Sequence, residues 1–248
     1  MARPLRHRIL KPLASLLKRY HMLLHGGYSI GRAYGCRFLI DWRHPIDKKL
    51  AFAMFENDRI MFFTGMVEHL RPQVFLDIGA HAALYSILAK SRVPTMETHA
   101  FEPDRTNLCQ LYSNLFLNKL ERHIQVYEHG LSDHQGMVGF DTSDEHERRG
   151  LRKVSASGTS SIEVRRLDDV LDLRGRTVAA KIDVEGHECE VIAGARDFLA
   201  GNKCYLQIES REENLPKLKG LLSAVGYRLV FSMGDHYFSN MSDEALRK

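Results

Sequence analysis

The sequence predicts an α/β fold with a doubly wound, mostly parallel seven-stranded sheet that ends in an antiparallel hairpin. After Pro72, short apolar runs of strand length alternate with longer segments of helical periodicity. This alternation is typical of parallel strands joined by crossover helices. The last two runs, 227–232 and 236–239, are separated only by a turn that contains Gly234 and Asp235, which indicates the closing hairpin.

The remaining elements follow from the same patterns. The chain of 248 residues suits one larger domain with a short appendage. We expect a basic amphipathic N-terminal helix over 1–27, strands and a helix that cover the site over 28–70, and the α/β domain over 71–241. Before the α/β domain, we expect a helix over 5–24, a hairpin over 31–40 and a helix over 51–55. In the first half of the domain, we expect strands over 74–78, 98–101 and 124–128, which alternate with helices over 82–90 and 106–119, and then half of a hairpin over 136–140. In its second half, we expect helices over 167–171, 193–199 and 215–225 and strands over 178–182 and 204–208.

The basic side chains are concentrated at the N-terminus. Residues 1–40 hold eight of the 35 basic side chains and none of the 31 acidic ones, which leaves a mildly acidic body. This distribution argues against a broadly basic nucleic-acid-binding protein. Two interpretations of the N-terminal helix stay open. The favoured one is a helix packed on the domain with a solvated basic face, and the other is peripheral contact of residues 1–25 with an anionic membrane or a partner.

Apolar patterning and cysteine usage both favour a cytoplasmic protein that could associate with a membrane. The stretch 13–17 is followed by Lys18 and Arg19 and is too short for the apolar part of a secretory signal. No segment approaches the roughly 18 apolar residues of a membrane span. The four cysteines lie far apart without a CxxC pair, which fits neither a zinc site nor a disulfide framework.

The turn after the first strand of the domain suits a small zwitterion. Asp77 ends the strand, Gly79 allows a tight turn, and Ala80 and His81 follow before the next helix. The N–H groups at the start of that helix suit a carboxylate, and Asp77 can pair with an ammonium group. One molecule with both groups is the methionine half of S-adenosylmethionine. A dinucleotide would favour a GxGxxG turn, which is not present here.

The second strand adds a candidate ribose ligand. Glu102 lies 25 residues after Asp77, at the end of the next strand, where an acid can accept hydrogen bonds from both ribose hydroxyls. Pro103 stops this strand because it has no N–H to donate. Ser132, in the segment after the third strand, is a further candidate cofactor residue.

The segment 180–188 places an unusual number of charges at a strand end. Alternation puts Lys181, Asp183 and Glu185 on one side as the strand leaves the sheet. The next strand contributes Glu209 to the same rim, and His187 is a candidate base. A structural ion pair is the alternative interpretation. A divalent metal between Asp183 and Glu209 is conceivable, but two carboxylates do not specify one, and we expect no resident metal.

Four blocks of the chain stand in the order and spacing of the FkbM-type methyltransferases, and the resemblance covers about residues 37–239. It implies a Rossmann-like class I methyltransferase fold, S-adenosylmethionine as methyl donor, and O-methylation of sugars, glycolipids or polyketide-like products. It implies cofactor roles for Asp77, Gly79 and Glu102, an active-site role for the block from Lys181 to Glu185, and an approach of Glu56 to the cofactor. The matching blocks are 75–81, 101–104, 167–171 and 181–188.

The chain departs from the family pattern at two positions in the first turn. His81 stands where the family usually has Asn, and Ala83 stands where it usually has a further Gly. We expect His81 to donate a hydrogen bond in place of the amide. Alanine is small enough for the backbone to approach the cofactor closely.

We therefore expect in-line transfer of a methyl group to a hydroxyl of a small, sugar-like acceptor. Asp183 or Glu185 would take the hydroxyl proton, directly or through water. The polar segment 141–161 would form a lid that recognises the acceptor. The alternatives are a natural-product O-methyltransferase, an N-methyltransferase or nucleic-acid methyltransferase, a nicotinamide-dependent oxidoreductase, and a cofactor-binding scaffold without catalytic activity.

Overall fold

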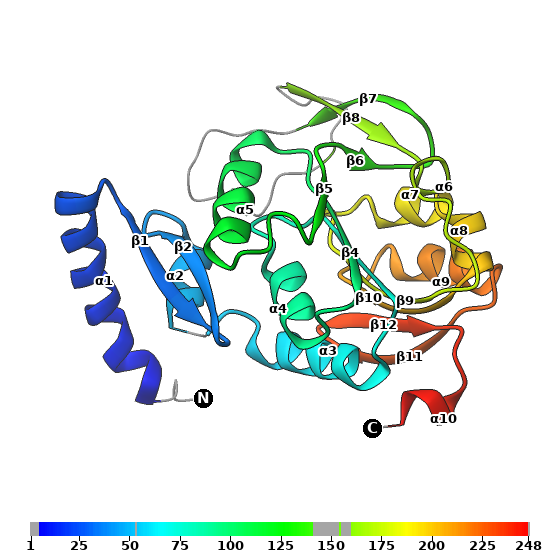
Figure 1. The fold of residues 1–248 in the computed structure, drawn as a ribbon, viewed down its shortest axis with the longest axis horizontal. Helices are drawn as coiled ribbons and strands as arrows, with labels where there is room; N and C mark the ends of the chain where they lie inside the picture. Colours follow the sequence, from blue (N-terminus) through cyan, green and yellow to red (C-terminus); the bar gives the residue numbers. More distant parts are fainter. Residues whose placement is uncertain (1–4, 53, 141–153, 155–159, 248) are drawn as a thin grey trace.

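A seven-stranded sheet with the order β11–β12–β10–β9–β3–β4–β5 forms the centre of the molecule (Figure 1). The computed structural model describes residues 5–52, 54–140, 154 and 160–247. Strands β10, β9, β3, β4 and β5 are parallel, and β12 and β11 are antiparallel to their neighbours, so the predicted sheet and closing hairpin are confirmed. The strands are β3 (Val74–Ile78), β4 (Glu97–Phe101), β5 (Gln125–Tyr127), β9 (Thr177–Ile182), β10 (Lys203–Ile208), β11 (Arg228–Met233) and β12 (Asp235–Ser239).

Helices cover both faces of this sheet because its strands are apolar on both sides. On one face, Phe75, Ala179 and Tyr205 pack into an apolar cluster with α3, α4 and α5. On the other face, Leu76, Ala180 and Leu206 belong to a second cluster with α7, α8 and α9. These helices are α3 (Asn57–Leu70), α4 (Leu84–Arg92), α5 (Arg105–Leu117), α7 (Glu188–Ala193), α8 (Arg196–Gly201) and α9 (Leu215–Ser223).

The N-terminal segment forms a helix and a two-stranded ribbon beside α5 (Figure 1). The backbone N–H of Leu39 donates to Oδ1 of Asn114, and that of Arg37 donates to Oδ1 of Asn118, so the ribbon is fastened to α5. The helix expected over 51–55 is wrong. Pro45 starts a helix earlier, in agreement with the preference of proline for the first helical turn. The elements are α1 (Leu5–His25), β1 (Tyr28–Ala33), β2 (Cys36–Asp41) and α2 (Pro45–Ala51).

A small three-stranded sheet lies beyond β5. It contains β6 (Gly130–Leu131), β7 (Gly136–Phe140) and β8 (Ser160–Arg165), and β7 pairs antiparallel with β8, as expected for half of a hairpin. The predicted lid 141–161 lies outside the described residues except for Val154 and the first residues of β8. The short helices α6 (Leu167–Val170) and α10 (Asp243–Leu246) complete the described elements.

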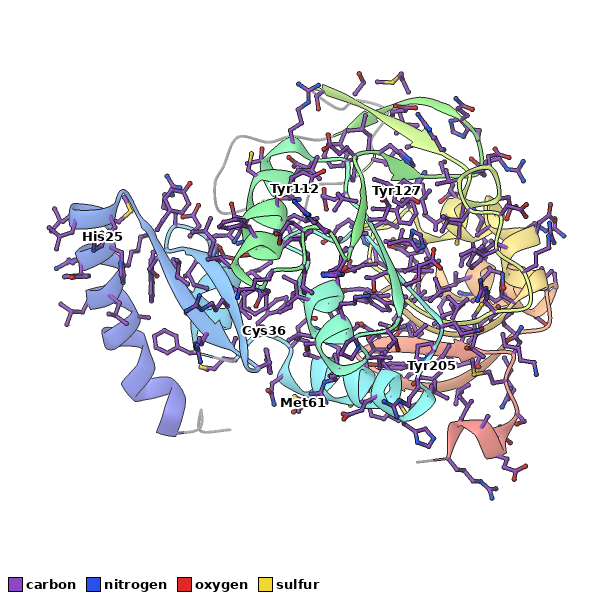
Figure 2. All side chains as sticks on the ribbon, in the orientation of Figure 1. His25, Cys36, Met61, Tyr112, Tyr127 and Tyr205 are labelled. Atoms are coloured by element: carbon purple, nitrogen blue, oxygen red, sulfur yellow. The ribbon has the colours of Figure 1, made fainter. Side chains whose placement is uncertain are left out.

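A row of polar side chains crosses the sheet on the α3/α4 face. Asp77 of β3 is in register with Lys181 of β9, and Lys181 is in register with Gln207 of β10. All three side chains are buried. Figure 2 shows how densely side chains fill the space between the sheet and its helices. The row places charged groups beside the carboxyl ends of β3 and β9, where the order of the strands reverses and where such sheets bind ligands.

Candidate active site

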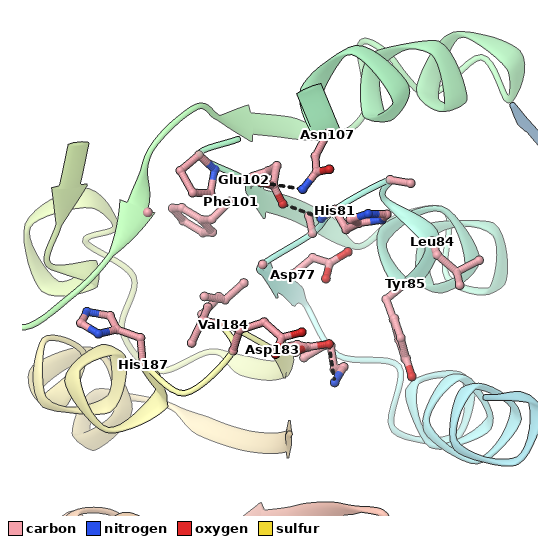
Figure 3. Close-up of a pocket in the computed structure, with 18 of the residues that line it drawn as sticks. Asp77, His81, Leu84, Tyr85, Phe101, Glu102, Asn107, Asp183, Val184 and His187 are labelled. Atoms are coloured by element: carbon pink, nitrogen blue, oxygen red, sulfur yellow. Dashed lines mark hydrogen bonds and ion pairs between the residues drawn. The ribbon is translucent and has the colours of Figure 1, made fainter. Parts of the chain in front are cut away.

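A cavity opens at the carboxyl ends of β3, β4 and β9 (Figure 3). It contains about 1230 Å³ of empty space, including its open mouth. Its walls come from the turn after β3, the end of β4, the turn after β9, the start of α2, and strands β6 and β8. The cavity therefore lies at the edge of the sheet where doubly wound folds bind their ligands.

Gly79 holds the two central turns of the cavity together. Its φ is 82°, and a Cβ at this position would lie 1.9 Å from the carbonyl oxygen of Asp183. The backbone N–H of Asp183 donates to the carbonyl of Ile78 at 2.9 Å. Only glycine allows both this conformation and this contact. The turn predicted to bind the cofactor and the turn predicted to hold the catalytic carboxylates are therefore in direct backbone contact.

Asp77 is a buried carboxylate held by neutral donors. Its Oδ2 accepts hydrogen bonds from the backbone N–H of Ser86 at 2.8 Å and from Oγ of Ser86 at 2.6 Å. Burial raises the pKa of Asp77 to about 6, although the Ser86 donors act in the opposite direction. A ligand ammonium would favour the ionised form of this group. Asp77 therefore fits the ammonium of the methionine half of S-adenosylmethionine.

Glu102, directly after β4, is likewise a buried carboxylate that accepts hydrogen bonds from neutral donors (Figure 3). Its Oε2 accepts from the N–H of His81 at 2.7 Å, and its Oε1 accepts from the N–H of Asp104 at 2.8 Å and from Nδ2 of Asn107 at 3.3 Å. Burial raises the pKa of Glu102 to about 7. Among the described residues, the buried Oδ1 of Asn107 has no hydrogen-bond partner. Within the described part of the chain, Glu102 forms no ion pair, and such a carboxylate beside an unpaired amide oxygen fits a ligand that brings hydroxyl donors, as a ribose does.

His81 replaces the usual asparagine with a half-buried imidazole on a strained backbone. Its φ is 48°, and the next but one residue, Ala83, has a φ of 60° and precedes α4. The helix therefore begins at Leu84, two residues later than expected from the sequence. Burial lowers the pKa of His81 to about 4, so the ring is neutral at physiological pH. Its Nε2 is buried without a partner among the described residues, and the ring stacks on His44 at 5.7 Å.

Lys181 is the centre of a second group of charges. Its Nζ lies 3.2 Å from Oδ2 of Asp235, 3.5 Å from Oδ2 of Asp183 and 3.6 Å from Oε2 of Glu209. Burial by itself would lower the pKa of Lys181, but these carboxylates raise it well above its ordinary value. The predicted pairing of Lys181 with Asp183 is present in the structure. The ammonium is therefore permanently charged, and it orients acids at the rim of the cavity.

Arg59 supplies a second cation to this group. Its guanidinium is 2.5 Å from Oδ1 of Asp235, 2.6 Å from Oε1 of Glu56 and 3.7 Å from Oε2 of Glu209. The side chain of Glu56, which lines the cavity, is thus already paired. Glu209 is half exposed, and burial together with the charge of Asp183 raises its pKa to about 8.

Glu185 lines the cavity from a strained turn. The strand ends at Ile182, so the expected alternation stops before Glu185, whose φ of 54° is unusual for a residue other than glycine. Burial and the negative charges of Asp183 and Glu188 raise the pKa of Glu185 to about 7. This value is suitable for a group that accepts a proton near neutral pH.

His187 and Ser132 contact each other. Nε2 of His187 lies 2.9 Å from Oγ of Ser132, and its Nδ1 lies 3.6 Å from Oε2 of Glu190. His187 reaches the wall of the cavity, whereas Ser132 is fully buried and is not among the residues that line it. The structure therefore separates Ser132 from the other candidate cofactor residues. Pro103 and Ala80 do line the cavity.

The structure adds residues that the sequence did not single out. Asp235 and Gln207 complete the group around Lys181, and Nε2 of Gln207 donates to Oδ2 of Asp235 at 2.5 Å. In the sequence, Gln207 is recognisable as a polar residue in an otherwise apolar strand. No sequence pattern indicates that Asp235 or Arg59 belongs to the site. The described residues include no set of three or more His, Cys, Asp or Glu side chains arranged to hold a metal ion.

Comparisons with known proteins identify a family of methyltransferases. The model described as the methyltransferase FkbM domain matches residues 77–229. Hexuronic acid methyltransferase AglP from Haloferax volcanii is 29% identical over 125 residues, which are 50% of this chain and 48% of AglP. The chain thus spans about half the length of this curated relative.

One solved structure shares the fold at low sequence identity. The FkbM methyltransferase from Methylobacillus flagellatus KT superposes with a TM-score of 0.51 and 19% identity, covering 78% of this chain and 54% of that chain. The precorrin-6y C5,15-methyltransferase from Geobacter metallireducens GS-15 has a TM-score of 0.44 and 19% identity, with 75% and 86% covered. Because the FkbM domain match includes more than half of the sequence, the chain belongs to the FkbM family of methyltransferases, whose methyl donor is S-adenosylmethionine.

Proposed function

We propose that this enzyme methylates a hydroxyl group of a small, sugar-like acceptor. The observation that supports this most directly is the contact between the two central turns at Gly79 and Asp183. It places a carboxylate that a buried ammonium orients beside the turn that would hold the cofactor. The name of AglP, a hexuronic acid methyltransferase, supports a sugar as the acceptor.

The cofactor would be held by groups that form no ion pair with any of the described residues. Asp77 would bind its ammonium, Glu102 its ribose hydroxyls, and the neutral ring of His81 its carboxylate. Gly79, Ala80 and Pro103 would shape the wall of the cavity along the cofactor. Bound S-adenosylmethionine supplies an electrophilic methyl group on a sulfonium.

The acceptor would lie on the side of Asp183, Glu185 and Glu209. A hydroxyl must lose its proton as the new bond to carbon forms, and a nearby carboxylate can take that proton. Asp183 is held in place by Lys181, and Glu185 has a pKa near neutrality. We assign proton transfer to Asp183 first and to Glu185 second, while Lys181, Glu56 and Arg59 position these acids. We assign His187 no part in proton transfer, because its Nε2 is hydrogen-bonded to Ser132. Its ring would only contact the acceptor.

A hexuronic acid also offers a carboxylate as acceptor, which needs no base. The acids around this part of the cavity disfavour that choice, because Asp183, Glu185 and Glu56 would repel a second negative charge there. The product distinguishes the two reactions. A methyl ether withstands mild alkali, whereas a methyl ester is hydrolysed.

The test is transfer of labelled methyl groups from S-adenosylmethionine to uronic acids, neutral hexoses and polyketide-like alcohols. With an active acceptor, Asp183→Asn should lower turnover by about 10²–10⁴-fold and leave cofactor affinity nearly unchanged. Glu185→Gln tests the second carboxylate, and Asp172→Asn is the matched control because the Asp172 side chain is 94% exposed.

Three outcomes would contradict the proposal. Unchanged turnover in both site variants would remove the carboxylates from proton transfer. An alkali-labile product would assign the reaction to a carboxylate acceptor. Cofactor binding without transfer to any member of the panel would favour the scaffold alternative.

A further inference from the structure

Helix α1 presents a stripe of large apolar side chains to solvent. Leu16, Tyr20, Leu23 and Leu24 are 65%, 50%, 83% and 63% exposed. Their spacing places them along one side of a helix. Figure 2 shows α1, with His25 near its end, at the margin of the molecule. Monomeric soluble proteins rarely expose such a contiguous apolar patch unless it binds something.

The opposite side of α1 is fixed to the domain. Leu17 packs against the apolar cluster of the α3/α4 face, and the ring of His21 stacks on the indole of Trp42 with 5.2 Å between centroids. The backbone N–H of Gly27 donates to the carbonyl of His21 at 2.9 Å, which ends the helix. The helix therefore does pack on the domain, as expected, but its outward face is apolar as well as basic.

Charge indicates which partner this face would bind. Residues 1–25 contain six basic side chains and no acidic one. Of the two bases between Leu16 and Tyr20 in the sequence, Arg19 is exposed and borders the apolar stripe, whereas Lys18 lies on another side of the helix. An apolar stripe bordered by a base, on a segment without acids, suits a layer that is anionic at its surface and apolar beneath it. A protein partner would need a groove with both properties.

The length of the helix limits the mode of contact. No helix in the described part of the chain is long and apolar enough to cross a membrane. We propose that α1 docks the enzyme on the anionic surface of a lipid bilayer, with the apolar stripe inserted among the headgroups and the bases against phosphates. This proposal goes beyond the reaction assigned above and does not depend on it.

The test is co-sedimentation of the full chain with vesicles of phosphatidylcholine alone and of phosphatidylcholine mixed equally with phosphatidylglycerol. We expect binding to the mixed vesicles to be about tenfold stronger or more, and to weaken as salt is added. The double substitution Leu23→Ser and Leu24→Ser should lower binding about tenfold or more. Phe116→Ser on α5 is the matched control, because Phe116 is 71% exposed and lies outside α1.

Cofactor affinity is measured on every variant to show that the domain is folded. Equal binding to both kinds of vesicle, no binding to the mixed vesicles, or an equal loss in Phe116→Ser would overturn the proposal. A dimer in solution that the double substitution converts to a monomer would assign the stripe to a second copy of the chain and would overturn it too.

Discussion

The carboxylates in the two halves of the cavity are stabilised by different kinds of groups. In the first half, Asp77 and Glu102 are held by backbone, hydroxyl and amide donors. In the second half, Asp183, Glu209 and Asp235 surround Lys181, and Asp235 also pairs with Arg59. The first half gains stability when a ligand brings donors or a positive charge, whereas the second half is already compensated by its own cations. Cofactor binding and orientation of the reacting groups are therefore assigned to chemically different surroundings.

The largest effect should come from Gly79→Ala, which breaks the contact between the halves. The strained φ and the overlap with the carbonyl of Asp183 should destabilise the fold by about 3–5 kcal/mol and abolish cofactor binding. Gly226→Ala is the matched control, because Gly226 has a φ of 86° and nothing within 4 Å of an added Cβ. If chemical denaturation shows equal losses of unfolding free energy for the two variants, the positive φ alone, and not the contact with Asp183, requires glycine at position 79.

The second-largest effect should come from removing the cation at the centre of the second half, the ammonium of Lys181. Lys181→Met leaves the buried carboxylate of Asp235 with Arg59 and the neutral amide of Gln207, and the free energy of unfolding should fall by about 3 kcal/mol. Lys90→Met is the control, because the buried ammonium of Lys90 donates to a backbone carbonyl and should cost less. Cofactor affinity should change little. A loss of affinity as large as that of a Glu102 variant would show that the halves are not separate.

The smallest effect concerns the pH dependence of cofactor binding. Hydroxyl donors favour the ionised carboxylate, so binding should lower the pKa of Glu102 from about 7. Binding then releases a proton, and affinity rises with pH up to about 7 and is constant above it. Calorimetry in two buffers of different ionisation enthalpy measures the release.

Glu102→Gln should remove this part of the pH dependence and weaken binding about tenfold at alkaline pH. A weaker slope near pH 6 should remain from Asp77, whose pKa is about 6. An unchanged slope in Glu102→Gln would show that Glu102 does not meet the ribose.

The sequence predicts the fold and the first half of the cavity better than the second. Asp77 lies near the end of a strand, and Gly79 and Glu102 directly follow strands, whose apolar runs are visible in the sequence, so their place at one edge of the sheet could be inferred. Lys181 and Asp183 could be paired for the same reason.

Arg59 and Asp235 could not be predicted, because they are 176 residues apart and meet only when α3 packs against β12. The sequence pattern predicts the start of α4 two residues too early, because His81 and Ala83 adopt a left-handed φ that helical periodicity does not predict. The ribbon formed by β1 and β2 also depends on long-range contacts, since Asn114 and Asn118 fasten it to α5.

The polar row of Asp77, Lys181 and Gln207 has a consequence for assembly of the sheet. Successive side chains of a strand point to opposite faces, so a slip of β9 by one residue would turn Lys181 into the apolar cluster beneath α7, α8 and α9. The ammonium would lose Asp235, and an apolar neighbour would face Asp77 instead. Apolar side chains alone distinguish the two registers poorly here, because both faces of β9 are covered. The same ammonium that orients the acids at the cavity thus selects the one alignment of three parallel strands in which the chain can fold.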